Sequence, residues 1–166
     1  MFQKDLLKGK RILVTGGGSG LGKAMATRYL ELGAEIYICG RRKSVLDESA
    51  KEMMELHGGS VKGISCDIKV PEAIEDMVEE IWAEGPLTGL VNNAAGNFIS
   101  RTEDLSPKAF NAISNIVFNG TFYTTNAIGK RWLDNKLNGS VISIITTWVH
   151  SLSLIHISEP TRPLII

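Results

Sequence analysis

Short apolar runs alternate with helical patterns along most of the sequence, and this alternation constrains the fold more than any other feature. The apolar runs, which suit strands, cover residues 11–15, 35–39, 61–66, 87–91 and 140–149. The helical patterns cover residues 23–32, 44–57, 71–84 and 106–135. Because each helical crossover returns the chain to the same edge of a sheet, the alternation predicts a doubly wound parallel α/β sheet. The pattern stops after the fifth strand, so we expect an incomplete version of this fold.

Individual residues mark where the helices begin and end. Gly33 and the pair Gly58–Gly59 follow helical patterns and are typical helix-terminating residues. Ser44 is expected to cap the second helix through its hydroxyl. Pro71 stands at the start of the third helix, where proline is tolerated because the first N–H groups have no partner inside the helix.

Charge and cysteine usage argue against several classes of function. Eighteen Lys and Arg balance eighteen Asp and Glu, so no net field favours nucleic acid or an anionic membrane surface. Cys39 and Cys66 lie far apart without metal-ligand spacing, which predicts core cysteines and no metal site. The sequence contains neither a bilayer-spanning apolar run nor an apolar signal segment, so we expect one cytoplasmic domain without a membrane span.

A glycine-rich turn joins the first strand to the first helix. Residues 15–22 read TGGGSGLG, a T-G-x-x-x-G-x-G spacing into which Gly16, Gly20 and Gly22 fit. A pyrophosphate needs backbone N–H groups and the positive end of a helix at close range, which only glycine permits. The turn therefore predicts a dinucleotide site of the Rossmann-like kind, and a simple flexible turn is the alternative.

The end of the second strand indicates which dinucleotide is bound. An NAD site usually places an acid there on the adenosine ribose, whereas this chain carries Arg41, Arg42 and Lys43. Arginine at this position suits the 2′-phosphate of NADP(H), which is the cofactor we predict. A solvated run of charge at a helix start is the alternative interpretation.

Two further segments complete a recognisable pattern. Residues 66–68 (CDI) follow the third apolar run and residues 92–96 (NNAAG) follow the fourth. Together with the glycine turn they resemble the short-chain dehydrogenase/reductase superfamily over residues 8–151. The resemblance implies that Asp67, otherwise a plain loop acid, hydrogen-bonds the adenine amino group. The cofactor-binding residues that the resemblance and the turn imply are Thr15, Gly16, Ser19, Gly20, Leu21, Gly22, Arg41, Asp67, Ile68, Asn93, Ala94, Ala95 and Gly96.

Within that superfamily, residues 93–100 (NAAGNFIS), 103–106 (EDLS) and 116–121 (IVFNGT) look like the 2,4-dienoyl-CoA reductase branch. This resemblance implies NADPH-dependent reduction of a 2,4-dienoyl-CoA thioester in fatty acid β-oxidation by a homotetramer. The amide of Asn97 is expected to hold the substrate's carbonyl oxygen, because a donor there stabilises the dienolate that hydride addition creates. A turn residue is the alternative for Asn97.

Three more residues are candidates on the same resemblance. Phe98 and Ser106 occupy positions that contact the acyl-CoA in this branch, although core packing and a helix N-cap explain them as well. Thr147 ends the fifth apolar run, where the superfamily carries its active-site serine, and its hydroxyl can donate a hydrogen bond.

The last part of the sequence departs from the superfamily pattern. Trp148 and Val149 stand where dienoyl-CoA reductases carry a tyrosine, no Tyr-x-x-x-Lys occurs, and no lysine follows Lys136. Superfamily chemistry relies on such a lysine to bind the nicotinamide ribose. Residues 152–166 carry two prolines and no helical pattern, and they resemble translated sequencing-adapter sequence; a disordered C-terminus is the alternative. We therefore expect residues 1–151 to form a truncated, inactive NADP-binding domain.

Three other interpretations stay open at this point. Other short-chain reductases, acting on 3-oxoacyl or on alcohol and ketone substrates, share the same cofactor half. The chain can also be a non-catalytic NADP-binding module. A third possibility is an unstable fragment, because ending after the fifth strand exposes a sheet edge.

Overall fold

A computed structural model of the protein describes residues 3–97 and 100–145. The strands are β1 (Arg11–Thr15), β2 (Glu35–Gly40), β3 (Val61–Ser65), β4 (Gly89–Asn92) and β5 (Ser140–Ser143). The helices are α1 (Gly20–Glu31), α2 (Lys43–His57), α3 (Pro71–Glu84), η1 (Thr102–Asp104), α4 (Pro107–Ser114), η2 (Asn115–Gly120) and α5 (Thr121–Asp134). Within the described residues, no helix has the length and apolar character needed to cross a membrane.

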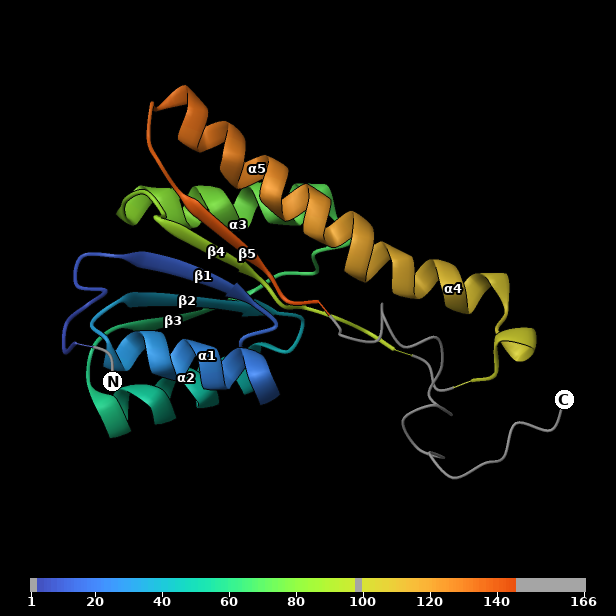
Figure 1. Cartoon of the computed structure of the whole chain (residues 1–166), viewed down its shortest axis with the longest axis horizontal. Coiled ribbons are helices and arrows are strands. Elements are labelled where there is room, and N and C mark those ends of the chain that lie inside the picture. The colour runs from blue at the N-terminus through green and yellow to red at the C-terminus, as the bar shows by residue number, and fades with distance from the viewer. Residues whose placement is uncertain (1–2, 98–99, 146–166) are drawn as a thin grey trace, which may run out of the picture.

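The predicted doubly wound sheet is confirmed. All strand pairs are parallel, in the order β3-β2-β1-β4-β5. Helices α1 and α2 cover one face of the sheet, and α3 and α5 cover the other (Figure 1). Successive side chains of β1 point to opposite faces of the sheet. Leu13 packs in the core on the α3 side and Val14 in the core on the α1 side, and both are fully buried. The strand order reverses between β1 and β4, which is where sheets of this kind bind ligands.

Several element ends differ from the expectation. α1 begins at Gly20 rather than Lys23, so the helix includes the last glycines of the turn. α2 begins at Lys43 with Arg42 as its N-cap and without a side-chain cap bond, so the prediction that Ser44 caps this helix is wrong. β5 ends at Ser143, whereas the apolar run had suggested a strand to residue 149; residues 146–149 lie outside the described part.

The predicted long helix over residues 106–135 is present, but its middle turn is π-helical. η2 joins α4 to α5 without a break. Gly120 closes this turn against the loop after β3, since a Cβ on it would lie 2.6 Å from Ile68 Cδ1. A π turn shifts the helical register by a fraction of a turn, and such turns occur frequently at functional sites.

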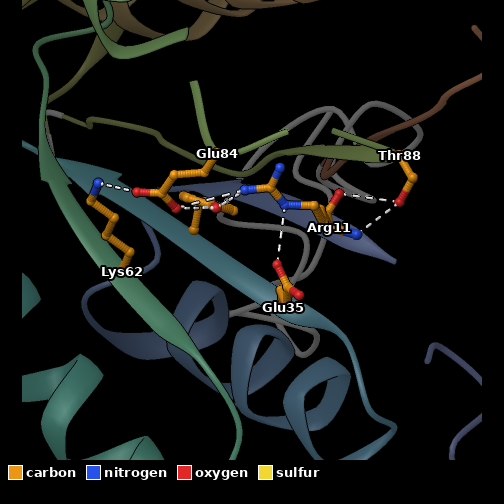
Figure 2. A network of polar contacts seen from close by, with 6 residues as sticks. Arg11, Glu35, Lys62, Glu84 and Thr88 are labelled. Atoms are coloured by element: carbon orange, nitrogen blue, oxygen red, sulfur yellow. Dashed lines mark hydrogen bonds and ion pairs between the residues drawn. The ribbon is translucent and has the colours of Figure 1, made fainter. Parts of the chain in front are cut away.

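A polar network lies at the amino ends of the strands (Figure 2). Arg11 Nε forms an ion pair with Glu35 Oε2 at 3.1 Å, and the Arg11 guanidinium also contacts the Tyr37 hydroxyl. The Tyr37 hydroxyl donates to Glu84 Oε2 at 2.7 Å, and Lys62 Nζ binds the other Glu84 oxygen at 2.6 Å. Because Arg11, Glu35 and Lys62 come from three different strands, the network fixes β1, β2 and β3 to the end of α3.

Both cysteines are free and buried, as expected from their spacing. Cys39 lies at the end of β2 and Cys66 just beyond β3, with both side chains in the core on the α3 side. Burial raises the pKa of the Cys66 thiol from 9.0 to about 11. Burial likewise raises the pKa of Cys39, and the neighbouring Cys66 adds to this shift. The neutral thiols are therefore part of the folded state.

We expect this pair to make the protein less stable in alkaline solution. The folded-state pKa values lie above the unfolded value of 9.0, so the stabilisation is fully present below about pH 9 and is lost as the pH rises toward 11. Each thiol contributes a slope of up to about 1.4 kcal/mol per pH unit. Urea unfolding of the protein and of a Cys39→Ala/Cys66→Ala variant between pH 7 and about 11 measures how the free energy of unfolding depends on pH. An identical pH dependence in both proteins would contradict the assignment.

Candidate cofactor site

The glycine turn is folded back against the loop that follows β4. Gly16 has a φ of +67°, a conformation that side chains rarely adopt. A Cβ on Gly22 would lie 2.5 Å from the Asn93 side-chain nitrogen and still closer to the Gly16 carbonyl oxygen. The first turn of α1 therefore lies so close to Gly16 and Asn93 that no side chain fits between them. This backbone-lined cradle is what a bound pyrophosphate needs.

Thr15 holds the carboxyl ends of β1 and β4 together. Its hydroxyl accepts hydrogen bonds from the Asn93 and Ala94 N–H groups, both at 3.0 Å, and donates to the Val91 carbonyl at 3.4 Å. The Asn93 amide donates in turn to the Thr15 carbonyl at 3.0 Å and to the Gly16 carbonyl at 3.4 Å. Thr15 is almost fully buried. These bonds fix the spacing between the two loops on either side of the strand-order reversal.

The amino end of α1 opens toward solvent at this edge. Ser19 is the N-cap in extended conformation, and its side chain makes no cap hydrogen bond. The N–H groups of Gly20, Leu21 and Gly22 in the first turn have no acceptor within the helix. Leu21 itself is 59% exposed, so its side chain does not close the helix end. These donors and the helix dipole favour an anion at this point.

Two adjoining hollows lie on either side of the Gly40–Arg41 backbone. The first, of about 130 Å³, is lined by Gly18, Ser19, Arg41 and Arg42, with Leu46 among its apolar walls. Among the ion pairs of the described chain, none involves Arg41 or Arg42. Both side chains are exposed. The first hollow thus combines backbone groups of the turn with two unpaired cations, which is a suitable environment for a phosphate.

The second hollow, of about 70 Å³, has more apolar walls. Its wall residues include Gly16, Asp67, Ile68, Ala94 and Ala95, all expected cofactor contacts, together with Ile116 of η2. The Asp67 carboxylate accepts the Lys69 N–H at 3.1 Å and forms an ion pair with Lys69 Nζ at 3.3 Å. The mixture of apolar walls and one carboxylate suits an adenine ring with its amino group.

The structure brings most of the predicted cofactor residues together, but it leaves the substrate candidates apart or undescribed. Asn97 is exposed in the loop after β4. Ser106 is the N-cap of α4, where its hydroxyl accepts the Ala109 N–H at 3.2 Å, so the N-cap interpretation holds for its local structure. Phe98 and Thr147 lie outside the described residues.

Ile116 is a wall residue that the sequence analysis did not find. It reaches the second hollow from the π-helical turn, and it packs so closely on Gly96 that a Cβ there would lie 2.8 Å from Ile116 Cδ1. A regular helical period gives no signal for this residue, because the π turn changes the direction in which it points. In the described part of the chain, no cluster of three or more acidic, histidine or cysteine side chains could hold a metal ion.

Comparisons with known proteins agree with this geometry. A family model described as short chain dehydrogenase matches residues 10–150. A Caenorhabditis elegans protein named "Probable 2,4-dienoyl-CoA reductase 3" is 45% identical over 154 residues, which are 91% of this chain and 50% of that protein. A Bacillus subtilis protein named "Probable 2,4-dienoyl-CoA reductase" is 38% identical over 89% of this chain and 59% of its own length. The chain thus spans about half the length of these relatives.

Solved structures show the same arrangement of elements. A short chain dehydrogenase from Bacillus anthracis superposes with a TM-score of 0.82 at 40% identity, covering 87% of this chain and 60% of that one. A metagenomic short-chain oxidoreductase in complex with NADP superposes with a TM-score of 0.77 at 25% identity, covering 84% of this chain and 63% of that one. The turn, the clamp at Thr15 and the two hollows therefore lie in an architecture that is shared by dinucleotide-dependent enzymes.

Proposed function

Because the chain belongs to the short-chain dehydrogenase family, we propose that it forms the NADPH-binding part of a reductase that acts on 2,4-dienoyl-CoA thioesters. The family makes it an oxidoreductase, and the similarity to 2,4-dienoyl-CoA reductases indicates the branch. The choice of NADPH and of the substrate is our proposal for the longer protein to which such a chain corresponds.

The pyrophosphate would lie at the amino end of α1. Gly20, Leu21 and Gly22 would donate their free N–H groups to it, while the absence of a side chain at Gly16 and Gly22 leaves room for close approach. Thr15 and Asn93 would not touch the cofactor through their side chains, since these are already bonded to each other's loop. Their role would be to hold the cradle open.

The observation that carries the choice of NADPH is the first hollow. Arg41 and Arg42 border it without an ion-pair partner in the described chain, and no carboxylate stands where a ribose-binding acid would be expected. Ser19 and Arg41 would contact the 2′-phosphate. Asp67, Ile68, Ala94, Ala95 and Gly96 would surround the adenosine in the second hollow and the adjoining loop.

The substrate side rests on the relatives' names and on four residues. When bound, NADPH supplies a hydride, which in this reaction reaches the far end of the conjugated thioester. Asn97 would donate a hydrogen bond from its side-chain amide to the thioester oxygen, where negative charge develops, and Thr147 would provide a second donor. Phe98 and Ser106 would contact the acyl-CoA. Asn97 is exposed and therefore accessible to a substrate that approaches over the loop after β4.

We expect the chain of 166 residues to bind NADPH without turning over substrate, because no lysine follows Lys136 to assist at the nicotinamide ribose. Fluorescence titration with NADPH tests cofactor binding, and absorbance assays with a 2,4-dienoyl-CoA test turnover. The same measurements on the product of the genomic locus read past codon 151 provide the comparison. Binding by both proteins and turnover by the longer one alone would support the proposal, whereas binding by neither would refute it.

A further inference from the structure

Ser49 connects helix α2 to the glycine turn. Its hydroxyl donates to the Gly18 carbonyl oxygen at 2.7 Å, across a separation of 31 residues in the sequence. The residue is only 4% exposed, and it is one of few buried polar residues in the described chain. A serine inside a helix commonly bonds to the carbonyl one turn before it. Here the hydroxyl is instead directed at the turn that would hold the cofactor.

This bond fixes the orientation of one peptide unit. The Gly18 carbonyl and the Ser19 N–H belong to the same planar trans peptide, so the two groups point in opposite directions. When Ser49 holds the Gly18 carbonyl, the direction of the Ser19 N–H is fixed as well. A peptide that follows glycine turns over easily without such a restraint, because glycine tolerates many backbone conformations.

Other contacts press α2 against the same peptide. A Cβ on Gly18 would lie 3.1 Å from Leu46 Cδ2 and 3.4 Å from Val45 Cγ1, so the first turns of α2 lie directly on it. Farther along the helices, Lys23 Nζ of α1 forms an ion pair with Glu52 Oε2 of α2 at 2.6 Å. The distance between α2 and the turn is therefore set independently of the Ser49 hydroxyl. What the hydroxyl adds is the direction of the Gly18–Ser19 peptide.

That peptide borders the hollow of Arg41 and Arg42, which have no ion-pair partner in the described part of the chain. Gly18, Ser19, Arg41 and Arg42 line it together, and Val45 and Leu46 of α2 form its apolar wall. We propose that Ser49 is a positioning residue: it fixes the Gly18–Ser19 peptide beside the 2′-phosphate site, and with it the Ser19 N–H, and so contributes to the preference for NADPH over NADH. This inference rests on the proposed function, since it takes the hollow to be the 2′-phosphate site.

The test compares two probes that differ only in the 2′-phosphate, adenosine 2′,5′-bisphosphate and adenosine 5′-monophosphate, by calorimetric titration of the full chain. Replacing Ser49 with alanine removes the donor and should weaken binding of the bisphosphate about tenfold, since a hydrogen bond to a charged group is involved. Binding of the monophosphate should change by less than about twofold. Ser44→Ala removes an exposed hydroxyl from the same helix and serves as the matched control.

Two more variants keep the test decisive if Ser49→Ala is poorly folded. Ser49→Cys has nearly the same shape but is a weak donor, so it should show the same selective loss of bisphosphate binding. Ser49→Thr keeps the hydroxyl and should therefore keep the preference for the bisphosphate. A parallel loss for both probes, or an unchanged ratio in a folded Ser49→Cys protein, would overturn the inference. If the unmodified chain binds neither probe, the proposed function itself fails, which is a different result.

Discussion

Replacement of Gly22 by alanine is expected to abolish measurable NADPH binding. The added Cβ would lie 2.5 Å from the Asn93 amide nitrogen and closer still to the Gly16 carbonyl, and neither neighbour is a flexible side-chain end. Asn93 is itself held by two hydrogen bonds to the Thr15 and Gly16 carbonyls. The cradle must therefore widen and move the N–H groups of the first turn of α1 away from the pyrophosphate. This should weaken NADPH binding at least about 100-fold, because hydrogen bonds to a charged group contribute about 1.5–3 kcal/mol each. Overpacking should also cost about 1–3 kcal/mol of stability.

Alanine variants of two other glycines distinguish the effect of the steric clash at Gly22 from the effect of replacing a glycine as such. Gly129 lies inside α5, and a Cβ added to it would have no neighbour within 4 Å, so Gly129→Ala should leave NADPH binding unchanged and stabilise the helix by about 0.5–1 kcal/mol. Gly20 also has open space, but its φ is +53°, so Gly20→Ala tests backbone strain without a clash. NADPH titration and thermal unfolding of the three variants measure both effects. Retained binding in Gly22→Ala would contradict the proposed place of the pyrophosphate.

The parts of the fold that depend on local pattern followed from the sequence. Buried parallel strands are short and apolar on both faces, so β1 and β2 were evident from their composition, and Pro71 correctly marked the start of α3. The glycine turn was also readable, because only a close backbone approach explains so many glycines between a strand and a helix. These features are set by residues that are neighbours in the chain.

What the sequence did not reveal depends on contacts between distant segments. Ser44 looked like the cap of α2, yet the helix begins at Lys43 with Arg42 as its N-cap and without any side-chain cap bond. Ile116 reaches the second hollow from η2, which is π-helical. Ser49 falls within the expected second helix, and its partner Gly18 lies in the turn before α1. Periodicity carries no information about such pairs.

The charged residues at the amino ends of the strands and those at the carboxyl ends differ in whether they have ion-pair partners. At the amino ends of the strands, Arg11, Glu35, Glu84 and Lys62 form a connected network of ion pairs (Figure 2), and Lys62 also pairs with Glu80. At the carboxyl edge, the charges of Arg41 and Arg42 have no such partners within the described chain. Charges that are paired contribute to folding, whereas charges that are left unpaired beside a hollow are available to a ligand. This contrast is the physical basis for expecting an anionic ligand at the carboxyl edge.

Replacing Arg41 with aspartate should therefore reverse the preference for the cofactor. The 2′-phosphate carries close to two negative charges, so the variant exchanges an attraction for a repulsion at the wall of the first hollow. The Kd of NADPH should rise at least about 100-fold, which corresponds to about 2.7 kcal/mol. The Kd of NADH should stay the same or fall, since a carboxylate at the end of the second strand can accept hydrogen bonds from the ribose hydroxyls. Parallel fluorescence titrations with the two nucleotides measure the ratio.

Lys51→Asp is the matched control for this reversal. It makes the same change of charge on α2, but the Lys51 side chain is 75% exposed and pairs with Glu55 at the surface. Salt screens such distant charges strongly, so at about 0.15 M ionic strength both nucleotides should bind this variant as they bind the unmodified chain. An equal loss of NADPH affinity in the two variants would mean that net charge, rather than Arg41 beside the hollow, sets the affinity. A loss of NADH and NADPH binding together in Arg41→Asp would place Arg41 in the fold of the turn instead of at the 2′-phosphate.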